Sequence, residues 1–234
     1  MEISNKLDAN LRHFHQLLRV NENFDVVYRV IQIGGRDACV YFVDGFAKDD
    51  TLLRILQGFT SLKPDAVPQT AHEFSKLFIP YGEVDLLTDD AEIAVQVLSG
   101  VPCLFVDGYS KCFAIDCRTY PARGVAEPDK DKVLRGSRDG FVETLVFNTA
   151  LIRRRIRDPQ MTIEVMQAGS KSHTDIALCY MEGRVDQDLL STIKKRIERL
   201  HVDALTMNQE SLAECLYKRR WYNPFPKFKY TERP

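Results

Sequence analysis

The sequence predicts an α/β (α+β) fold of two subdomains, each a mixed or antiparallel sheet backed by helices. The first observation is a repeated order of strand, glycine turn, strand, acid–glycine turn and helix, at 25–59 and again at 161–200. The second is a linker-like stretch at 118–140, rich in proline, glycine and charge. The third is a hydrophobic fraction of 44% in 234 residues, which is enough for a sizeable core.

These observations predict an N-terminal subdomain over 1–135, a C-terminal subdomain over 136–220 and a tail over 221–234. In the first copy of the repeat, the β-branched segment 25–33 and the turn signal GGRD lead into an apolar segment at 38–45, expected to be a buried inner strand. A helix should follow over 48–59, with apolar residues at helical spacing: Leu52, Leu53, Ile55, Leu56 and Phe59.

The middle of the chain predicts three further groups of elements. We expect a proline-bounded helix within 62–82, then a strand and an acid-capped helix within 83–102. Two strands should follow within 103–120. If Asp107 and Gly108 form a two-residue hairpin turn between them, Cys103 and Cys112 face each other across the hairpin.

The C-terminal subdomain should begin with a helix over 141–156 that carries Phe141, Leu145, Ile152 and Ile156 on one stripe. The arginines at its end suit the helix dipole. The second copy of the repeat then predicts a strand over 161–168, an inner strand over 175–183 and a helix within 184–200. Asp186 or Asp188 is its expected cap, and the core-facing residues are Leu189, Leu190, Ile193, Ile197 and Leu200.

Two similar hexapeptides, VYFVDG and CLFVDG, and a looser third copy, LCYMEG, end on an acid followed by glycine at 44–45, 107–108 and 182–183. One interpretation is a set of three acids arranged around a cleft. The other is turn chemistry, because glycine takes positive φ and aspartate tolerates the neighbouring turn position. The frequency of Asp-Gly between strands favours turns.

Composition and motifs exclude several classes of function. A formal charge of −1, from 32 basic and 33 acidic residues, gives no electrostatic case for nucleic acid as the main partner. The chain contains no Walker loop, no H-E-x-x-H and no G-x-S-x-G, so we expect no cofactor, no metal and no catalytic residue. Six cysteines without a C-x-x-C pair, and no signal-peptide core, favour a reduced cytosolic compartment. No apolar run is long enough to span a bilayer.

Two segments carry candidate binding residues. Arg135 and Arg138 flank a helix start whose N–H groups could hold an anion, whereas the alternative is a capped helix whose arginines pair with acids or hold the subdomains together. The candidates for ligand or inter-subdomain contacts are Arg135, Arg138, Asp139, Asn148 and Arg153.

The second segment is the tail, which mixes aromatic residues with cations, as at a membrane interface. The alternative is an extended tail that docks on its own domain. Such a mixture could also bind single-stranded nucleic acid, but the sequence has no RNP-like strand motif to support this. The candidate membrane-interface residues are Lys218, Arg219, Arg220, Trp221, Tyr222, Phe225, Lys227, Phe228 and Lys229.

The segments RGSRDGFVETLVFNTALIRRRIRDP (135–159) and NPFPKFKYTERP (223–234) resemble the A subunit of spore nutrient germinant receptors. The resemblance is dense over 133–234 and looser before it. It implies a cytosolic N-terminal domain followed by membrane helices in the spore inner membrane, with this domain on the cytoplasmic, spore-core side. It also implies B and C subunits as partners and a nutrient-gated ion-release pathway. The N-terminal domain of this family has been likened to solute-binding proteins with two α/β lobes.

Three hypotheses follow for the function. The first is a non-enzymatic domain for sensing, signal relay or subunit assembly in nutrient-triggered germination. The second is a small-ligand module, with an amino acid or a sugar between the two lobes. The third is an enzyme acting on a phosphorylated or acylated substrate, which would lack any spaced catalytic constellation.

Overall fold

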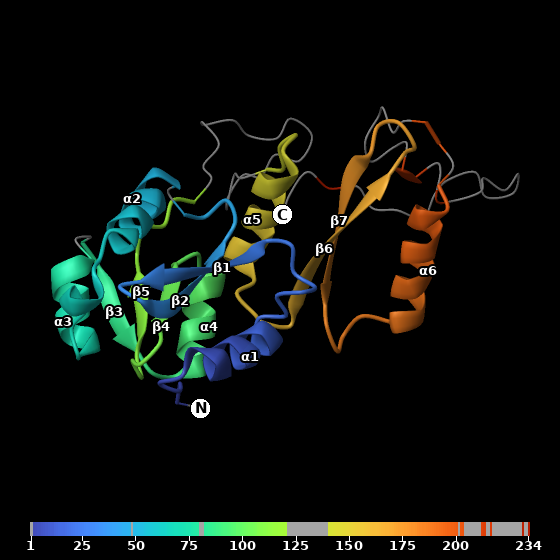
Figure 1. Ribbon diagram of the computed structural model, residues 1–234. Helices are drawn as coiled ribbons and strands as arrows, with labels where there is room; N and C mark the ends of the chain where they lie inside the picture. Colours follow the sequence, from blue (N-terminus) through green and yellow to red (C-terminus); the bar gives the residue numbers. More distant parts are fainter. Residues whose placement is uncertain are drawn as a thin grey trace, which may run out of the picture. The chain divides into compact units, whose positions relative to one another are not determined.

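The computed structural model describes residues 2–47, 49–79, 82–120, 140–200, 202–203, 212–213, 216, 231 and 234. The chain divides into two compact units, which we call unit 1 (Met1–Ala122 with Val146–Met161) and unit 2 (Arg123–Leu145 with Thr162–Pro234). The described strands pair as antiparallel neighbours in unit 1 and as a hairpin in unit 2, with helices packed against them (Figure 1). The predicted α+β class with antiparallel sheets is therefore confirmed.

Unit 1 contains a five-stranded sheet. Its strands are β1 (Val26–Ile33), β2 (Arg36–Val43), β3 (Val84–Leu87), β4 (Cys103–Val106) and β5 (Cys112–Ile115). They lie in the order β1-β2-β4-β5-β3, and each neighbouring pair is antiparallel. β4 and β5 are buried throughout and β2 along most of its length, which confirms the predicted inner strand at β2.

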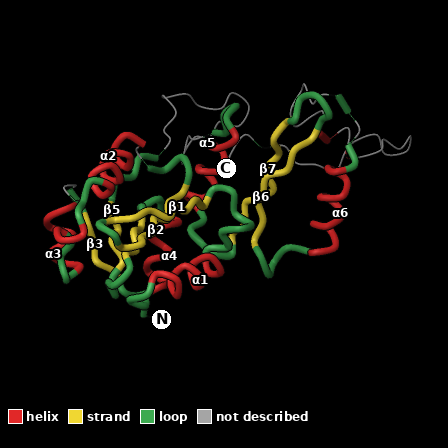
Figure 2. Tube along the Cα trace, viewed as in Figure 1, coloured by secondary structure: helices red, strands yellow, loops and turns green. Residues whose placement is uncertain are grey.

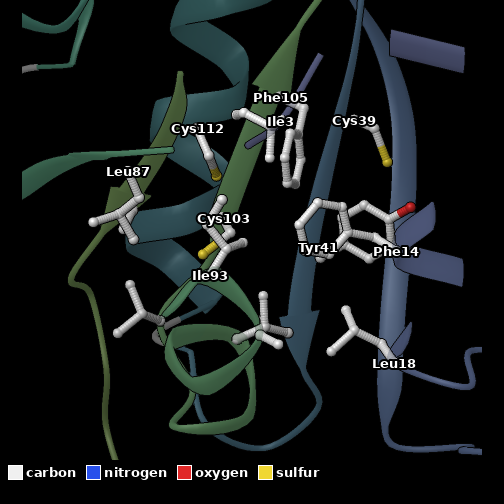
Figure 3. Close-up of a cluster of buried hydrophobic side chains, with 14 of the residues drawn as sticks. Ile3, Phe14, Leu18, Cys39, Tyr41, Leu87, Ile93, Cys103, Phe105 and Cys112 are labelled. Carbon is white, nitrogen blue, oxygen red and sulfur yellow. The ribbon is translucent and has the colours of Figure 1, made fainter. Parts of the chain in front are cut away.

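Helices cover both faces of this sheet (Figure 2). One cluster of buried side chains joins the sheet to α1 (Leu7–Leu17) and α4 (Asp90–Leu98). The other joins it to α2 (Asp49–Thr60), to Val67 directly after the short 3₁₀ helix η1 (Pro64–Ala66), and to α3 (Ala71–Phe78). Figure 3 shows the first cluster, in which the sulfur atoms of three cysteines lie among apolar side chains. Alternating residues of the inner strands thus reach two separate cores.

Local caps explain where two of these helices begin. The carboxylate of Asp89 accepts the Glu92 N–H at 3.1 Å, which confirms the predicted acid-capped helix. The hydroxyl of Thr70 accepts the Glu73 N–H at 3.3 Å and donates to the Glu73 carboxylate at 2.9 Å. Asp89 and Thr70 thus each accept a hydrogen bond from an N–H group that would lack a partner in the first helical turn.

The described part of unit 2 is the hairpin β6 (Met161–Ala168) and β7 (Thr174–Met181), followed by α6 (Gln187–Glu198). Asp186 caps α6 by accepting the N–H groups of Asp188 and Leu189 at 3.0 and 3.1 Å. The hairpin and α6 share a small apolar cluster around Ala168 and Ile197. Beyond α6, the chain returns to the hairpin loop, where the Lys171 N–H donates to the Asp203 carbonyl at 3.0 Å.

Some predicted positions in these helices and strands are wrong. β7 is not an inner strand, because within the described residues it pairs with β6 alone and its side chains are half-buried or exposed. Leu53 and Leu189 are 52% and 53% exposed. Leu53 directly follows the buried Leu52, Leu189 directly precedes the buried Leu190, and adjacent helical positions do not share a face. Ile156 is 38% exposed because α5 (Leu145–Arg155) ends before it.

The predicted two-residue turn at Asp107 and Gly108 is also wrong. Cys103 pairs with Ala114 rather than with Cys112, so the connection between β4 and β5 is longer. The reason is that this loop also holds the start of α1. The Asp107 carboxylate accepts the Leu7 N–H at 2.9 Å, and the Gly108 N–H donates to the Asn5 carbonyl at 2.8 Å.

The predicted subdomain boundary at 135/136 lies outside the described residues and stays a prediction. The fold adds one fact to it. The prediction assigned the helix after the linker to the C-terminal subdomain, whereas the contacts of α5 from Val146 onward place it in unit 1. This helix also begins at Leu145 rather than at Phe141.

Candidate functional site

The most unusual polar group of unit 1 is the guanidinium of Arg153, which α5 places in the interior with no exposed surface. Its Nε and Nη2 donate to the two carboxylate oxygens of Asp25 at 2.8 and 2.9 Å. Nη2 also donates to Oδ1 of Asn23 at 3.0 Å, and Nη1 donates to the Met161 carbonyl at 3.0 Å. A two-pronged arginine–carboxylate pair of this kind fixes both the distance and the orientation of its partners.

The partners of Arg153 are themselves held by the backbone just before β1. Asn23 and Asp25 are each 2% exposed. The Asn23 side-chain amide donates to the Leu18 carbonyl at 3.0 Å, at the end of α1. The Asp25 carbonyl accepts the Asp44 N–H at 2.8 Å, at the acid–glycine turn after β2. The buried ion pair therefore joins the end of α1, the start of β1 and the turn after β2.

The energetics of this group depend on its completeness. Burying an ion pair is expensive, and the attraction between the charges offsets that cost only when hydrogen bonds satisfy the remaining donors and acceptors. Here the guanidinium makes four hydrogen bonds to three residues. Removing one charge alone would leave the other buried without a partner, which typically costs about 3–5 kcal/mol.

Arg153 also acts on the point where the chain passes from unit 1 to unit 2. Met161, whose carbonyl it binds, is the last residue of unit 1 in this part of the chain, and Thr162 is the first of unit 2. Met161 is also the first residue of β6. The arginine thus fixes, within unit 1, the residue from which the hairpin of unit 2 starts.

Only two of the sequence-predicted binding residues fall in the described part of the chain. Asn148 is half-buried on α5, and Arg153 lies on the same helix with its bonds directed to other residues of unit 1. Arg135, Arg138 and Asp139 lie outside the described residues, as do the tail candidates from Lys218 to Lys229. The predicted anion site, the predicted membrane interface and the ligand or inter-subdomain role of Arg153 all stay predictions.

Sequence reasoning missed Asn23 and Asp25. The only signal was the polar run ENFD directly before a β-branched strand, which also suits an ordinary exposed turn. Nothing in that run indicates that two of its side chains are buried.

The acid–glycine repeats are turns. Gly45, Gly108 and Gly183 have φ values of +80°, +91° and +75°, a region that residues with a Cβ rarely adopt. This confirms the turn interpretation of the repeated hexapeptides.

The cysteines of the described residues have a structural environment. Cys39, Cys103, Cys112 and Cys117 are buried, and Cys179 is exposed. Burial raises the pKa of the Cys39 thiol to about 12, which keeps it protonated and poorly nucleophilic. Among the residues that the structure describes, no group of three histidine, cysteine or acidic side chains could hold a metal ion. In the same residues, no helix has the length and apolar character needed to cross a bilayer.

The fold of this chain has a counterpart among solved structures. It matches the crystal structure of the N-terminal domain of the A subunit of the Bacillus megaterium spore germinant receptor GerK3, with a TM-score of 0.70 at 23% identity, over 100% of this chain and 86% of that one. The family model described as Bacillus/Clostridium GerA spore germination protein matches residues 13–234. The chain therefore belongs to the GerA family of spore germination proteins, which confirms the resemblance seen in the sequence.

Relatives in Bacillus subtilis (strain 168) agree with this assignment. The chain is 36% identical to Stage V sporulation protein AF over 230 residues, covering 96% of this chain and 46% of that protein. It is 30% identical to the uncharacterized membrane protein YfkQ over 212 residues, covering 90% and 41%. It is 29% identical to Spore germination protein KA over 221 residues, covering 92% and 40%. The chain spans less than half the length of these relatives.

Proposed function

We propose that this chain is the N-terminal domain of a spore membrane protein of the receptor A-subunit type and that it acts in germination as a non-enzymatic assembly and signal-relay domain. The family assignment and the names of its relatives support this proposal. The membrane location is supported by the relative described as a membrane protein. The proposed location is the spore inner membrane, with this domain on the spore-core side. B and C subunits are the proposed partners.

The observation that carries the relay role is the buried ion pair of Arg153. A relay needs a physical connection between a surface that senses a change and a segment that passes it on. The turn after β2 is bonded to Asp25 through the Asp44 N–H, and Asp25 is bonded to Arg153. Arg153 in turn binds the Met161 carbonyl, where the chain leaves unit 1. A displacement of Asp44 at the turn would therefore pass through Asp25 and Arg153 to Met161, the first residue of β6.

The experiment must distinguish loss of the Asp25–Arg153 connection from loss of folding stability. A double variant, Arg153→Met with Asp25→Leu, removes both charges and keeps apolar volume, a replacement that is often neutral for stability. It would be placed in the full-length protein in spores that lack the natural copy. We expect nutrient-triggered loss of optical density to be abolished or strongly slowed, while the melting temperature of the isolated domain stays within a few degrees of wild type.

The matched control is the surface pair of Lys171 and Asp203, whose side chains are 75% and 70% exposed. Replacing both with alanine removes one cation and one aspartate, as the double variant does, but should leave germination unchanged. Normal germination in spores that carry the folded double variant at the wild-type level would refute the relay role of the Arg153 pair.

A further inference from the structure

A second arginine group lies on unit 1, around the ring of Tyr120. The buried side chain of Phe46 holds this ring in place, because the two rings pack edge-to-face with centroids 5.2 Å apart and an interplanar angle of 86°. Its hydroxyl donates to the Ser99 carbonyl at 3.0 Å. Tyr120 is therefore a rigid platform at the surface, only half-buried, with one ring face and the hydroxyl oxygen still accessible to other side chains.

Two exposed arginines converge on this platform from the end of α5. The Arg154 guanidinium lies over the ring, with Cζ 5.0 Å from the centroid. The Arg157 Nη2 donates to the Tyr120 hydroxyl oxygen at 3.4 Å. The tyrosine thus orders two long cationic side chains that would otherwise sample many rotamers. Ordered guanidinium groups cost less conformational entropy when they bind a ligand.

The charge of this group is not balanced by acids. Within the described residues, neither Arg154 nor Arg157 has a carboxylate at ion-pair distance, whereas the nearby Arg118 is paired with Asp116 and Arg153 is paired with Asp25. The neighbouring Asp158 carboxylate accepts the Gln160 N–H at 2.8 Å instead. The dipole of α5 explains cations in its last turn, but Arg157 lies beyond that helix.

The surroundings of the two arginines are partly apolar. Phe147, two helical turns before Arg154 on the same side of α5, is 45% exposed. Ile156, between the two arginines in the sequence, is 38% exposed. Exposed apolar side chains beside cations are common where a protein contacts the headgroup region of a membrane.

We propose that Tyr120, Arg154 and Arg157 form a phosphate-binding site on unit 1. A phosphate presents several oxygens, and the planar fork of each guanidinium can donate two parallel hydrogen bonds to such a group. The tyrosine holds the two forks at one place, and the bound anion supplies the negative charge that the described surroundings lack. The phosphate can belong to a lipid headgroup or be free in solution, since both offer the same oxygens. The site is independent of the relay role proposed above.

The test uses the whole chain and two probes. Inorganic phosphate would be titrated by NMR or calorimetry, and vesicles of phosphatidylglycerol would be compared with vesicles of phosphatidylcholine by co-sedimentation. In the double variant Arg154→Gln with Arg157→Gln, we expect at least one of the two probes to bind roughly tenfold more weakly, because charge-assisted hydrogen bonds are lost. The matched control, Arg155→Gln, changes a neighbouring exposed arginine outside the Tyr120 group and should alter binding less than about twofold.

The outcomes are distinguishable. Weaker binding of phosphatidylglycerol vesicles without an effect on free phosphate would assign the site to lipid, and the reverse would assign it to a soluble phosphate; either result supports the site. Equal binding of both probes by wild type and the double variant would overturn it, as would an equal loss in the control. Arg154, Arg155 and Arg157 are exposed, so we expect each variant to melt like wild type. Circular dichroism melting checks this and excludes unfolding as the cause of weaker binding.

Discussion

The hairpin–helix of unit 1 and that of unit 2 are built to the same plan. β1 and β6 have 8 residues each, β2 and β7 have 8, and α2 and α6 have 12. Both second strands end in an acid–glycine turn with positive φ at the glycine. The predicted repeat is therefore present in three dimensions, in one case within a five-stranded sheet and in the other as a two-stranded hairpin.

The two copies agree in their cores and differ beside them. Phe59 and Ile197 occupy the same position of their helices and are 1% and 2% exposed. Where unit 1 has Leu56 and Phe42 packed against its core, the corresponding residues of unit 2 are Lys194 and Tyr180. The difference shows that the copies keep the packing that forms the fold but not the chemistry at its margin.

The polar residues of unit 2 form a connected group. The Lys194 ammonium is 2.5 Å from the Glu164 carboxylate and 5.6 Å from the Tyr180 ring centroid, and the Tyr180 hydroxyl donates to the same carboxylate at 3.3 Å. Burial is the largest single influence on the pKa of Lys194 and lowers it, but the hydrogen bonds and charge interactions with Glu164 and Tyr180 together outweigh burial, so the pKa is raised. An ion pair takes the place that an apolar contact holds in unit 1.

The largest expected effect concerns the shared core position. Phe59→Ala should destabilise unit 1 by about 3–5 kcal/mol, because it removes a ring that is 5.7 Å from Phe74 in a fully packed core. Ile197→Ala should destabilise unit 2 by about 2–4 kcal/mol, since fewer buried atoms are lost. Hydrogen exchange at β1–β2 and at β6–β7 under mild denaturant measures each unit separately. A larger loss for Ile197→Ala would break the comparison of the two cores.

The acid–glycine turns should respond unequally to alanine. Positive φ alone costs an L-residue about 1 kcal/mol, which is the loss expected for Gly183→Ala because no atom lies within 4 Å of the added Cβ. A Cβ at Gly45 would lie 3.1 Å from Val146 Cγ1, so Gly45→Ala should cost about 2 kcal/mol. Urea unfolding of the two variants gives the difference. Equal losses would mean that α5 shifts to accept the methyl group.

The smallest expected effect concerns the polar group of unit 2. Lys194→Met should destabilise it by about 0.5–1 kcal/mol, since both side chains of the pair are about one third exposed at 28% and 32% and solvent screens them. Lys194→Leu with Tyr180→Phe, which installs the residues of unit 1, should recover part of this loss by apolar packing. Chemical denaturation measures both. A loss above about 2 kcal/mol for the single variant would show a buried, structural ion pair instead.

Sequence patterns predict the elements of both copies because each pattern is local. The alternation of strands, the helical spacing of Leu52 and Phe59, and the cap at Asp186 act within a few residues. These patterns do not fix register, and the two-residue turn at Asp107 was wrong because that loop also binds the start of α1.

The candidate site could not be predicted in the same way. Arg153 and Asp25 are 128 residues apart in the sequence, and no spacing rule connects them. The arginine run at the end of α5 predicts cations suited to a helix dipole, but not which of them turns inward. Burial of a charge is decided by the partners that the fold supplies, and these become visible only in three dimensions.

The discontinuity of unit 1 has a practical consequence for anyone who shortens the gene. A truncated product ending at residue 122 would contain every strand of the five-stranded sheet but not α5, which belongs to unit 1 from Val146 onward. Asp25 would then be left without the cation that neutralises it. We expect such a fragment to aggregate or to be degraded, so dissection of this domain by deletion should retain the segment through Met161 or graft it back by circular permutation.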